Sequence, residues 1–563
     1  MRQPGFESAQ NEYLNLKRWL FDSAFPLWSS VGRDDVNGGF FEKISKDGLP
    51  IEEARRTRVV CRQIYSFSVA KKMGWAGDAE AVVRHGWEFL KQNCFNPDGS
   101  LVTKVDIKSG AVNASFDLYD HAFALFGLSS AATVLENSDE ISSAALQCLE
   151  AMIAGWKHPE AGFQEAAPPA EPLRSNPHMH LFEAFLAWVE NQVAKNNNLW
   201  FSMLNETGQL CLDKFICGAN GAVCEYFDRD WSVMVDMQAA PVEPGHQFEW
   251  AWLLTKWGRM VGRKDALLAA RRLIEVGEQG VSETFKLAQN GLGFELETVE
   301  DGYRLWPQTE RIKAWLAMAE TAITPEQRDR AFAKVAEAAR GLQSFFLAKP
   351  KGSWIDRFDR YGHPIDDHAP ASSLYHIVCA IEEMDRLLQP STEQTPALFL
   401  DRDGVVIEDT GYPNEIENIR LIPGAAETIR IFREKGYKVF VVTNQSGIGR
   451  GYYDDLDYIL LKEHLSKLLR KDGAIIDDER ACPYHINATV EEYRADHYWR
   501  KPSPGMIDDL VRRWSVDRTR SLLIGDKDTD LQAASAAGIR GELFTGKNLL
   551  DFISGKLIEF EER

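Results

Sequence analysis

Two patterns of apolar and polar residues divide this chain. Up to about residue 390, apolar residues recur every three or four positions, which is the spacing of one helix face. One such face carries Val82, Val83, Trp87 and Leu90. Comparable segments lie near residues 6–24, 57–73, 115–135, 178–195, 265–279, 308–323, 325–346 and 371–388. Helix pairs at near-constant spacing indicate a closed ring of helical hairpins, although no exact internal repeat is legible.

The pattern changes after a polar stretch at residues 391–396, which we interpret as a linker. Short apolar runs then alternate with helical segments, and this alternation predicts an open, doubly wound parallel sheet. The runs lie at 397–401, 438–443 and 521–525, and the helical segments near 424–435, 455–470, 503–514 and 529–537. We therefore expect an all-α domain, a closed ring of helical hairpins, at 1–390 and an α/β domain at 397–563.

Composition narrows the classes of function. Among 563 residues, 64 Lys+Arg face 84 Asp+Glu, and the net charge of −20 disfavours nucleic acid and anionic membranes as partners. No apolar run is long enough for a membrane span, and no secretory signal is visible. The eight cysteines have no paired spacing, as in reduced cytoplasmic proteins. We expect a cytoplasmic enzyme that acts on small molecules and could form a homodimer.

Chemically active side chains follow three strands of the second domain. Asp401 and Asp403 come directly after the first apolar run, Thr443 ends the second, and Asp526 follows the third. Ligands bind at the carboxyl ends of strands in such sheets. Asp401 could attack phosphorus and Asp403 could protonate the leaving oxygen. The segment Arg500-Lys501-Pro502 offers a cation for the phosphoryl oxygens, and the stretch 525–530 offers carboxylates for a hard cation such as Mg²⁺.

These motifs resemble the haloacid dehalogenase superfamily, and within it the heptose bisphosphate and histidinol phosphate phosphatases. The resemblance rests on Asp401-Arg402-Asp403-Gly404, the segment 443–451, Arg500-Lys501-Pro502 and Gly525-Asp526. It implies Asp401 as nucleophile, Asp403 as general acid and base, and Mg²⁺ held by Asp401, Asp526 and the Asp403 carbonyl. It also implies phosphoryl or substrate contacts from Thr443, Asn444, Arg500 and Lys501. The short intervals leave no room for a large cap, so specificity must come from loops or from the other domain.

A zinc site typical of that branch is altered here. Cys482, His485 and His497 could supply three ligands, but a structural site needs four. Tyr484 and Trp499 stand where the family has ligands. We therefore expect no zinc.

Histidines dominate the chemistry of the helical domain. His246 and His376 each lie near the start of a predicted helix that would face the centre of the ring. Two imidazoles across a cavity can move a proton from one carbon of a sugar to the next, because each titrates near neutral pH.

The strings around these histidines resemble the N-acylglucosamine 2-epimerase family, which includes mannose isomerases and other aldose–ketose isomerases. They are residues 62–65, 119–123, 176–181, 243–250, 306–310 and 375–376. The resemblance implies an (α/α)6 barrel with His246 and His376 as the acid/base pair. It also implies substrate-binding or supporting roles for Arg62, His180, Glu249, Trp306 and Gln308. Arg55, Arg56 and Arg58 could clamp a phosphate or simply be solvated.

Three functions remain open from the sequence. The first is a bifunctional enzyme that interconverts fructose 6-phosphate and mannose 6-phosphate and hydrolyses a sugar phosphate. The second is a heptose bisphosphate phosphatase fused to an independent barrel enzyme. The third treats the barrel as a carbohydrate-binding module without catalysis, which the paired histidines disfavour.

Overall fold

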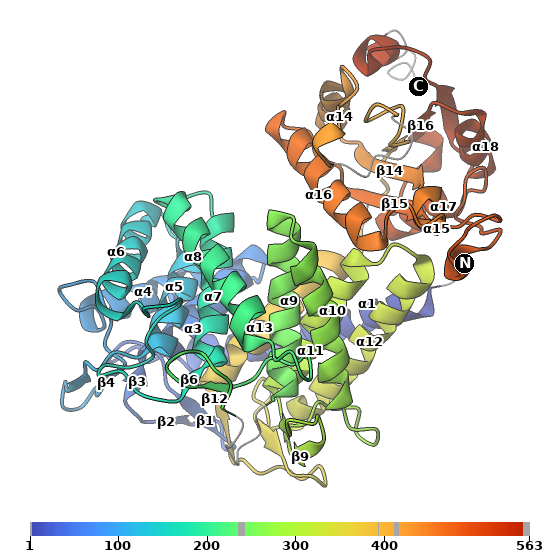
Figure 1. Ribbon diagram of the computed structural model, residues 1–563. Coiled ribbons are helices and arrows are strands. Elements are labelled where there is room, and N and C mark those ends of the chain that lie inside the picture. The colour runs from blue at the N-terminus through green and yellow to red at the C-terminus, as the bar shows by residue number, and fades with distance from the viewer. Residues whose placement is uncertain (1–2, 235–241, 392, 410–415, 555–563) are drawn as a thin grey trace.

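The computed structural model describes residues 3–234, 242–391, 393–409 and 416–554, and it divides into a helical body and an α/β body (Figure 1). The last helix of the first body ends at Leu388, and the first strand of the second begins at Ala397. Residue 392 of the expected linker lies outside the described residues. No helix in the described part of the chain is long and apolar enough to cross a membrane.

Twelve helices of the first body form two concentric layers. Six inner helices contact one another in a closed ring, and six outer helices cover them. The inner helices are α3 (Thr57–Lys72), α5 (Leu118–Ala131), α7 (Ser175–Glu190), α9 (Pro244–Val261), α11 (Trp306–Thr321) and α13 (Leu374–Leu388). The outer helices are α1 (Pro4–Trp19), α4 (Ala79–Asn93), α6 (Ser138–Trp156), α8 (Asn197–Leu210), α10 (Lys264–Gln279) and α12 (Pro325–Gln343). The ring agrees with the expected (α/α)6 barrel.

Burial explains which helix takes which layer. Almost every residue of α5 and α9 is buried, because an inner helix is covered on all sides. The outer helices α4 and α10 bury one face only, and the predicted face of α4 with Val82 and Trp87 is the buried one. The short helix α2 (Phe25–Ser30) follows α1.

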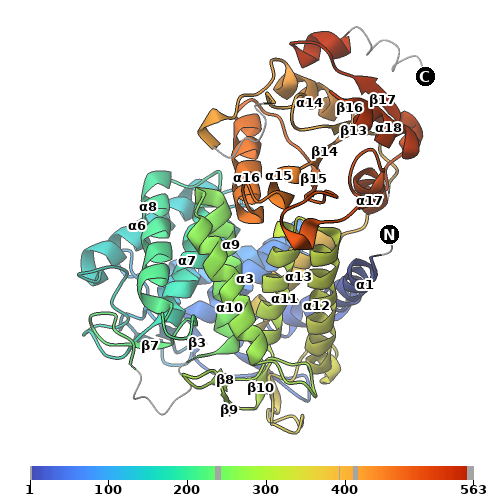
Figure 2. The same cartoon turned by 45° about the vertical axis from the view of Figure 1, so that its right-hand side comes forward.

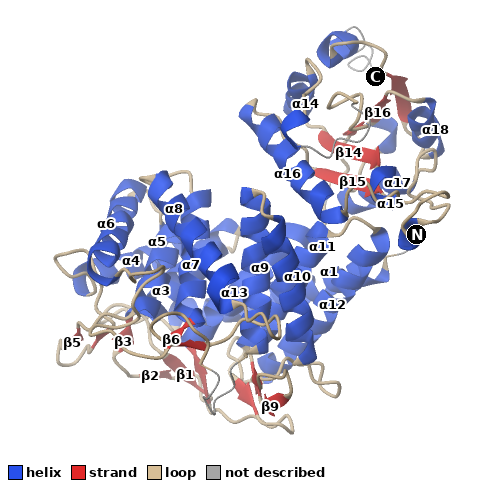
Figure 3. Ribbon diagram, viewed as in Figure 1, coloured by secondary structure: helices blue, strands red, loops and turns tan. Residues whose placement is uncertain are grey.

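Short hairpins gather at one end of the barrel, where the inner helices begin (Figure 3). Their strands pair in antiparallel fashion across the loops. They are β1 (Lys43–Ser45), β2 (Pro50–Ile51), β3 (Arg55–Arg56), β4 (Lys104–Val105), β5 (Val112–Asn113), β6 (Leu173–Arg174), β7 (Tyr226–Phe227), β8 (Gly291–Leu292), β9 (Thr298–Glu300), β10 (Tyr303–Arg304), β11 (Arg357–Phe358) and β12 (His368–Pro370). This end is therefore the mouth toward which the first turns of α9 and α13 point.

A repeat that the sequence hides becomes visible at the starts of four inner helices. One buried polar side chain near each start bonds both the backbone of its own helix, four residues earlier, and the loop after the preceding outer helix. His121 bonds Leu101, His178 bonds Phe163, and Gln247 bonds Val223. Gln308 bonds Ala288 in the same way. The repeat is one of structural role rather than of sequence, because two histidines and two glutamines make the same kind of contact.

The second body is a five-stranded parallel sheet in the order β15-β14-β13-β16-β17. Its strands are β13 (Ala397–Leu400), β14 (Lys438–Asn444), β15 (Asp478–Cys482), β16 (Leu522–Gly525) and β17 (Arg540–Leu543). Helices α14 (Ala425–Glu434), α15 (Ser446–Gly449), α16 (Asp455–Lys471), α17 (Gly505–Trp514) and α18 (Asp528–Ala536) connect them. The chain leaves the central strand β13 toward β14 and returns toward β16, so a topological switch point lies beside β13.

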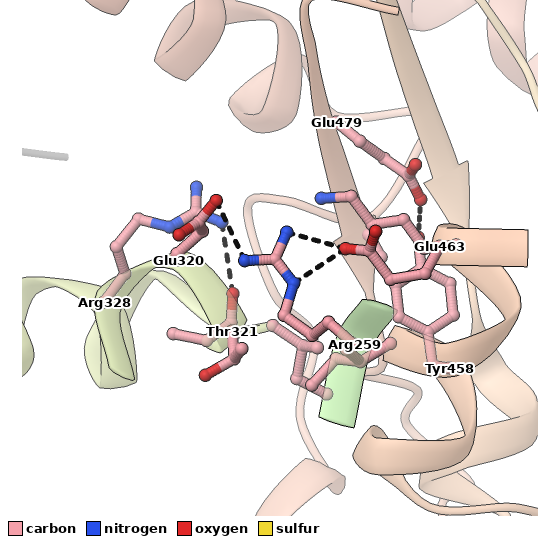
Figure 4. A pocket seen from close by; sticks show the side chains of 12 residues that line it. Arg259, Glu320, Thr321, Arg328, Tyr458, Glu463 and Glu479 are labelled. Atoms are coloured by element: carbon pink, nitrogen blue, oxygen red, sulfur yellow. Dashed lines mark hydrogen bonds and ion pairs between the residues drawn. The ribbon is translucent and has the colours of Figure 1, made fainter. Parts of the chain in front are cut away.

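The α/β body rests on the barrel end opposite the hairpins (Figure 2). There Arg259, near the end of α9, makes ion pairs with Glu320 of the barrel and Glu463 of α16 (Figure 4). The pocket beside these ion pairs has a volume of only ≈ 20 Å³, about enough for one water. Larger cavities of ≈ 280 and ≈ 770 Å³ also lie between the two bodies, so the bodies touch at such ion pairs and leave open space beside them.

Candidate active sites

The two predicted barrel histidines both lie beside one tryptophan. The ring centroid of Trp306 is 4.9 Å from that of His246 and 5.7 Å from that of His376. All three residues occupy the first turns of their helices, at the hairpin end. The structure therefore brings together the pair that the sequence predicts, with Trp306 next to both.

His246 is surrounded by carboxylates. Its Nδ1 lies 2.9 Å from Glu225 Oε1 and 4.0 Å from Glu243 Oε2. Burial alone would lower the pKa of His246, but the negative charges of Glu225, Glu243 and Glu249 outweigh it and raise the pKa to about 9. This imidazole is therefore protonated at neutral pH.

His376 is held in the opposite state. Burial, together with the positive charges of Arg62 and Lys313, keeps its pKa well below the ordinary value of 6.5. Its Nδ1 lies 3.0 Å from Glu310 Oε1, and Lys313 makes an ion pair with the other oxygen of Glu310 at 2.5 Å. Because Lys313 already balances Glu310, that carboxylate does not force a proton onto the imidazole.

The remaining predicted side chains form the wall between these histidines. Arg62 donates to the Tyr119 hydroxyl at 2.7 Å and lies 4.0 Å above the Phe123 ring. His180 Nδ1 lies 3.4 Å from Glu183 and 3.7 Å from Glu249, and burial lowers the pKa of His180 to about 4. The hydrogen bonds that Arg62 makes within the described residues go to the Tyr119 hydroxyl and the Ser372 carbonyl rather than to a carboxylate, so its guanidinium can face an oxyanion.

Two predicted contacts have other partners in the structure. The amide of Gln308 is buried and occupied by loop backbone, so this residue supports the fold of the mouth. Each arginine of the basic string is paired with a carboxylate: Arg55 with Asp34, Arg56 with Glu42, and Arg58 with Asp120. These pairs disfavour the phosphate clamp.

The second site lies at the carboxyl ends of β13 and β16. Lys501 Nζ sits 2.8 Å from Asp401 Oδ1 and 2.6 Å from Asp530 Oδ1, and all three side chains are buried. Asp401, Asp526 and Asp530 offer oxygens within 4.8 Å of one another. Burial and the charge of Asp401 raise the pKa of Asp526 to about 6.

This carboxylate group fits Mg²⁺. Asp526 Oδ1 is buried without a hydrogen-bond partner, and oxygen ligands are those that Mg²⁺ prefers. Gly404 approaches so closely that a Cβ there would lie 2.5 Å from Asp526 Oδ2, and its φ of +84° also favours glycine. The backbone beside Asp403 is thereby free to approach the same point.

The predicted phosphoryl contacts divide into two groups. Thr443 and Lys501 line the site, and the Lys501 ammonium also donates to the Val442 carbonyl at 2.9 Å. Asn444 instead fixes the backbone of Lys501 with two hydrogen bonds, and Arg500 donates to the Tyr484 carbonyl at 3.1 Å. Asn444 therefore positions Lys501, while a substrate contact from Arg500 stays a prediction.

Asp403 is held by two side chains that the sequence did not single out. The buried guanidinium of Arg402 donates to both oxygens of Asp403 at 2.9–3.1 Å. Gln445 donates its Nε2 to Asp403 Oδ2 at 2.9 Å and to the Thr443 hydroxyl at 2.7 Å. Arg402 also donates to Gln445 Oε1 at 3.0 Å, which closes the network.

The altered zinc loop has a different set of contacts. The Tyr484 ring stacks on His497 at 4.0 Å, and both side chains bond Glu326 of α12. Cys482, His485 and His497 form no metal-like group among the described residues. The expected loss of zinc stays a prediction, and the loop serves as a contact between the two bodies.

Three residues of the barrel site were missed by the sequence reasoning. Glu225, Glu310 and Lys313 set the charge on the two histidines. Glu225 and Glu310 lie far along the chain from His246 and His376, so only the ring brings them together, and Lys313 follows Glu310 by three residues on α11. In the second site, Asp530 from the acidic stretch 525–530 joins Asp401 and Lys501.

The structure also brings together two barrel groups with ligand-like spacing that the sequence did not suggest. They are His180, Glu183 and Glu249, and Glu225, Glu243 and His246. Each is an extension of the acid/base site already described.

A closed helical ring with paired histidines at its mouth, followed by a parallel sheet with an aspartate pair at its switch point, defines a fused sugar epimerase or isomerase and phosphatase. Comparison with known proteins agrees. The N-acylglucosamine 2-epimerase (GlcNAc 2-epimerase) family matches residues 39–380, and the HAD-hydrolase-like family matches residues 498–548. The chain belongs to the N-acylglucosamine 2-epimerase family and carries a HAD-type phosphatase domain after the barrel. Both domains belong to enzyme families.

Individual relatives divide in the same way. A mannose-6-phosphate isomerase of Rhizobium meliloti is 39% identical over 66% of this chain and 97% of its own length. A D-glycero-beta-D-manno-heptose-1,7-bisphosphate 7-phosphatase of Rhodopseudomonas palustris is 44% identical over 30% of this chain and 95% of its own length. The cellobiose 2-epimerase structure from Spirochaeta thermophila shares the barrel fold, with a TM-score of 0.59 at 18% identity, over 68% of this chain and 97% of its own.

Proposed function

We propose that this protein is a bifunctional sugar enzyme, with an aldose–ketose isomerase in the barrel and a Mg²⁺-dependent sugar phosphate phosphatase in the second domain. The observation that carries the isomerase is the pair of histidines beside Trp306, whose pKa values move in opposite directions. Groups whose environments push their pKa values apart divide into an acid and a base.

The proposed isomerisation uses that division. His376, neutral, takes the proton from carbon 1 of an open-chain ketose. Arg62 faces the negative charge on oxygen 2 of the enediolate. Protonated His246 then gives a proton to carbon 2 while the hydroxyl proton on oxygen 1 passes to oxygen 2, so that carbon 1 becomes the aldehyde. Proton exchange with water returns both imidazoles to their starting states. The similarity to a mannose-6-phosphate isomerase supports fructose 6-phosphate and mannose 6-phosphate as the sugars.

The proposed hydrolysis takes place in two steps on the second site. An Asp401 oxygen forms a bond to phosphorus as the bond to the sugar oxygen breaks, and Asp403 gives that oxygen a proton. Water then attacks phosphorus, Asp403 takes the water proton, and Asp401 leaves as a carboxylate. Lys501 and Thr443 hold the phosphoryl oxygens. Mg²⁺, held by Asp401, Asp526 and the Asp403 carbonyl, would neutralise charge on the phosphoryl group.

A second candidate concerns the phosphatase substrate. The 44% identity to a heptose bisphosphate phosphatase favours a heptose bisphosphate over a hexose phosphate. One incubation separates the two: the protein with Mg²⁺ and either fructose 6-phosphate or a heptose 1,7-bisphosphate, followed by analysis of sugars and phosphate. Formation of mannose 6-phosphate reports isomerisation only, whereas release of phosphate and free hexose from the first substrate supports the leading proposal. Release of phosphate from the second substrate alone would make the heptose bisphosphate the phosphatase substrate, as in the second candidate.

A further inference from the structure

We propose that the barrel positions a catalytic group of the phosphatase. Barrel side chains bind helix α16, and α16 in turn contacts the residues that hydrogen-bond to Asp403. The barrel thereby sets the efficiency of proton transfer from Asp403 to the leaving group. This inference rests on the proposed role of Asp403. It concerns a link between the two bodies rather than either reaction alone.

Of the two residues that hold Asp403, Arg402 contacts α16 itself and Gln445 contacts the residue before the N-cap of α16. The hydroxyl of Tyr453, the residue before the cap, donates to Gln445 Oε1 at 2.6 Å. The guanidinium of Arg402 lies 5.5 Å from the ring centroid of Tyr458, in the first turn of α16. A shift of this helix would therefore move the side chains of Arg402 and Gln445, and with them the carboxylate of Asp403.

The barrel holds the start of the same helix. Lys264 of α10 pairs with Asp454 and Asp457, both at 2.7 Å, and Arg271 pairs with Asp455 at 2.6 Å. Asp454 and Asp457 also form the capping box of α16, so the barrel cations hold the carboxylates that begin the helix.

Two further contacts between the barrel and α16 lie farther along the helix. Glu463, farther along α16, pairs with Arg259, as Figure 4 shows. A small apolar cluster joins Leu267 of the barrel to Leu456, Ile459 and Leu460 of α16. The barrel thus contacts α16 on the turns that precede and follow Tyr458, while Tyr458 itself donates to Glu479 within the sheet.

The two catalytic centres cannot share a mouth in this arrangement. His246 lies in the first turn of α9 and Arg259 near its end, thirteen residues later. At about 1.5 Å per residue the interface lies roughly 20 Å from the isomerase site along that helix. The proposed link to the phosphatase runs through α16 and does not require a substrate to pass from one site to the other.

The test uses leaving groups of different stability. Departure of p-nitrophenolate from p-nitrophenyl phosphate needs little proton transfer, whereas the sugar oxygen of mannose 6-phosphate needs a proton from Asp403. The value of kcat/KM reports the step in which the leaving group departs. The ratio of kcat/KM for the two substrates therefore measures how much proton donation by Asp403 contributes to that step. Loss of folding or of metal lowers both values and leaves the ratio unchanged.

Three variants are compared with the wild type: Tyr453→Phe, the double variant Lys264→Ala/Arg271→Ala, and the control Arg272→Ala. Arg272 is next to Arg271 on α10, but the hydrogen bonds it makes stay within the barrel. We expect the first two to lower the sugar phosphate to aryl phosphate ratio about 3- to 10-fold, a fraction of the roughly 10²–10⁴-fold that a general acid supplies, and the control to leave it unchanged.

An unchanged ratio in both Tyr453→Phe and the double variant would overturn the inference. Asp403→Asn separates this failure from that of the proposed function. If Asp403→Asn strongly lowers the sugar phosphate to aryl phosphate ratio and the interface variants do not, Asp403 is the proton donor but the barrel does not position it. If Asp403→Asn leaves the ratio intact, the role of Asp403 fails and the inference fails with it. Where the wild type hydrolyses heptose 1,7-bisphosphate rather than mannose 6-phosphate, that ester takes its place in the ratio.

Discussion

Two histidines of the same chemical kind stand in opposite protonation states because of the residues beside them. Glu225 and Glu243 face His246, whereas Arg62 and Lys313 face His376. Trp306 lies beside both rings and contributes no charge of its own. The direction of proton transfer is thus set by the neighbouring charges rather than by the histidines themselves.

The pH dependence of isomerisation follows from these directions. His376 must be neutral, and its pKa lies well below 6.5, so kcat/KM should fall only at pH values clearly below 6.5. His246 must be protonated, so kcat/KM should fall as the pH rises through about 9. We expect a broad plateau between these limits in a profile of isomerase kcat/KM. A narrow maximum near pH 6.5, as for two ordinary histidines, would contradict the assignment.

Replacement of either histidine tests the same pair. His376→Asn and His246→Asn should each lower isomerase kcat by about 10²–10⁴-fold, the usual contribution of a general acid or base. Hydrolysis of mannose 6-phosphate supplied directly should stay within twofold, because the second domain has its own core. Retention of isomerase activity in both single variants would exclude the two-histidine mechanism.

At the scale of elements, the barrel depends on polar side chains that join inner helices to loops. Gln247 both donates to and accepts from the backbone of Val223, in a fully buried position. Such side chains explain why sequence comparison along the chain finds no literal repeat: the helical period is regular, but the joining residue is histidine in two hairpins and glutamine in others.

Gln247→Ala should therefore destabilise the barrel. It leaves a buried donor and a buried acceptor without partners, each worth about 1–3 kcal/mol, and we expect a loss of about 2–4 kcal/mol in the free energy of unfolding. Tryptophan fluorescence during urea unfolding reports mainly this domain, which holds 14 of the 16 tryptophans. Gln92→Ala, at an exposed position in the last turn of α4, is the control and should cost about 0.5 kcal/mol or less. Equal stability of the two variants would show that the joining bonds are dispensable.

Much of the architecture could be predicted from the sequence, because it depends on periodicity. The central strands at 397–400, 438–444 and 522–525 are apolar and were expected, whereas the edge strands β15 and β17 were missed. Their residues, Asp478–Cys482 and Arg540–Leu543, include charges that are satisfied by partners outside the strand, such as Asp509 for Arg480. Catalytic residues at strand ends and helix starts carried a local signal. Their partners Glu225, Glu310 and Gln445 did not, since tertiary packing alone selects them.

At the scale of the whole molecule, the two domains carry separate chemistry on a common frame. Asp401→Asn should lower phosphate release by about 10³-fold or more and leave isomerisation within twofold, because the amide cannot attack phosphorus and lacks charge for Mg²⁺. Assays of phosphate and of aldose on the same preparation check both halves. Continued release of phosphate by the Asp401→Asn variant would move the nucleophile elsewhere.

Removal of metal by chelation should affect the phosphatase activity and not the isomerase activity. EDTA should remove hydrolysis, and added Mg²⁺ should restore it, while isomerisation continues. The proposed proton transfer between two imidazoles needs no metal, although two barrel groups, around His246 and around His180, have ligand-like spacing. Loss of isomerase activity with EDTA, and its return with a divalent cation, would show that one of the barrel groups binds metal.

The most direct test of the account is the origin of the hydrogen at carbon 2 of the aldose. The protein is incubated in deuterated water with fructose 6-phosphate and Mg²⁺, and the aldose and phosphate are analysed at early conversion. We predict mannose 6-phosphate, or mannose after hydrolysis, with solvent deuterium at carbon 2, because the proton returns from an imidazole that exchanges with water. Aldose that carries at carbon 2 the hydrogen moved from carbon 1, or no aldose at all, would contradict the central claim.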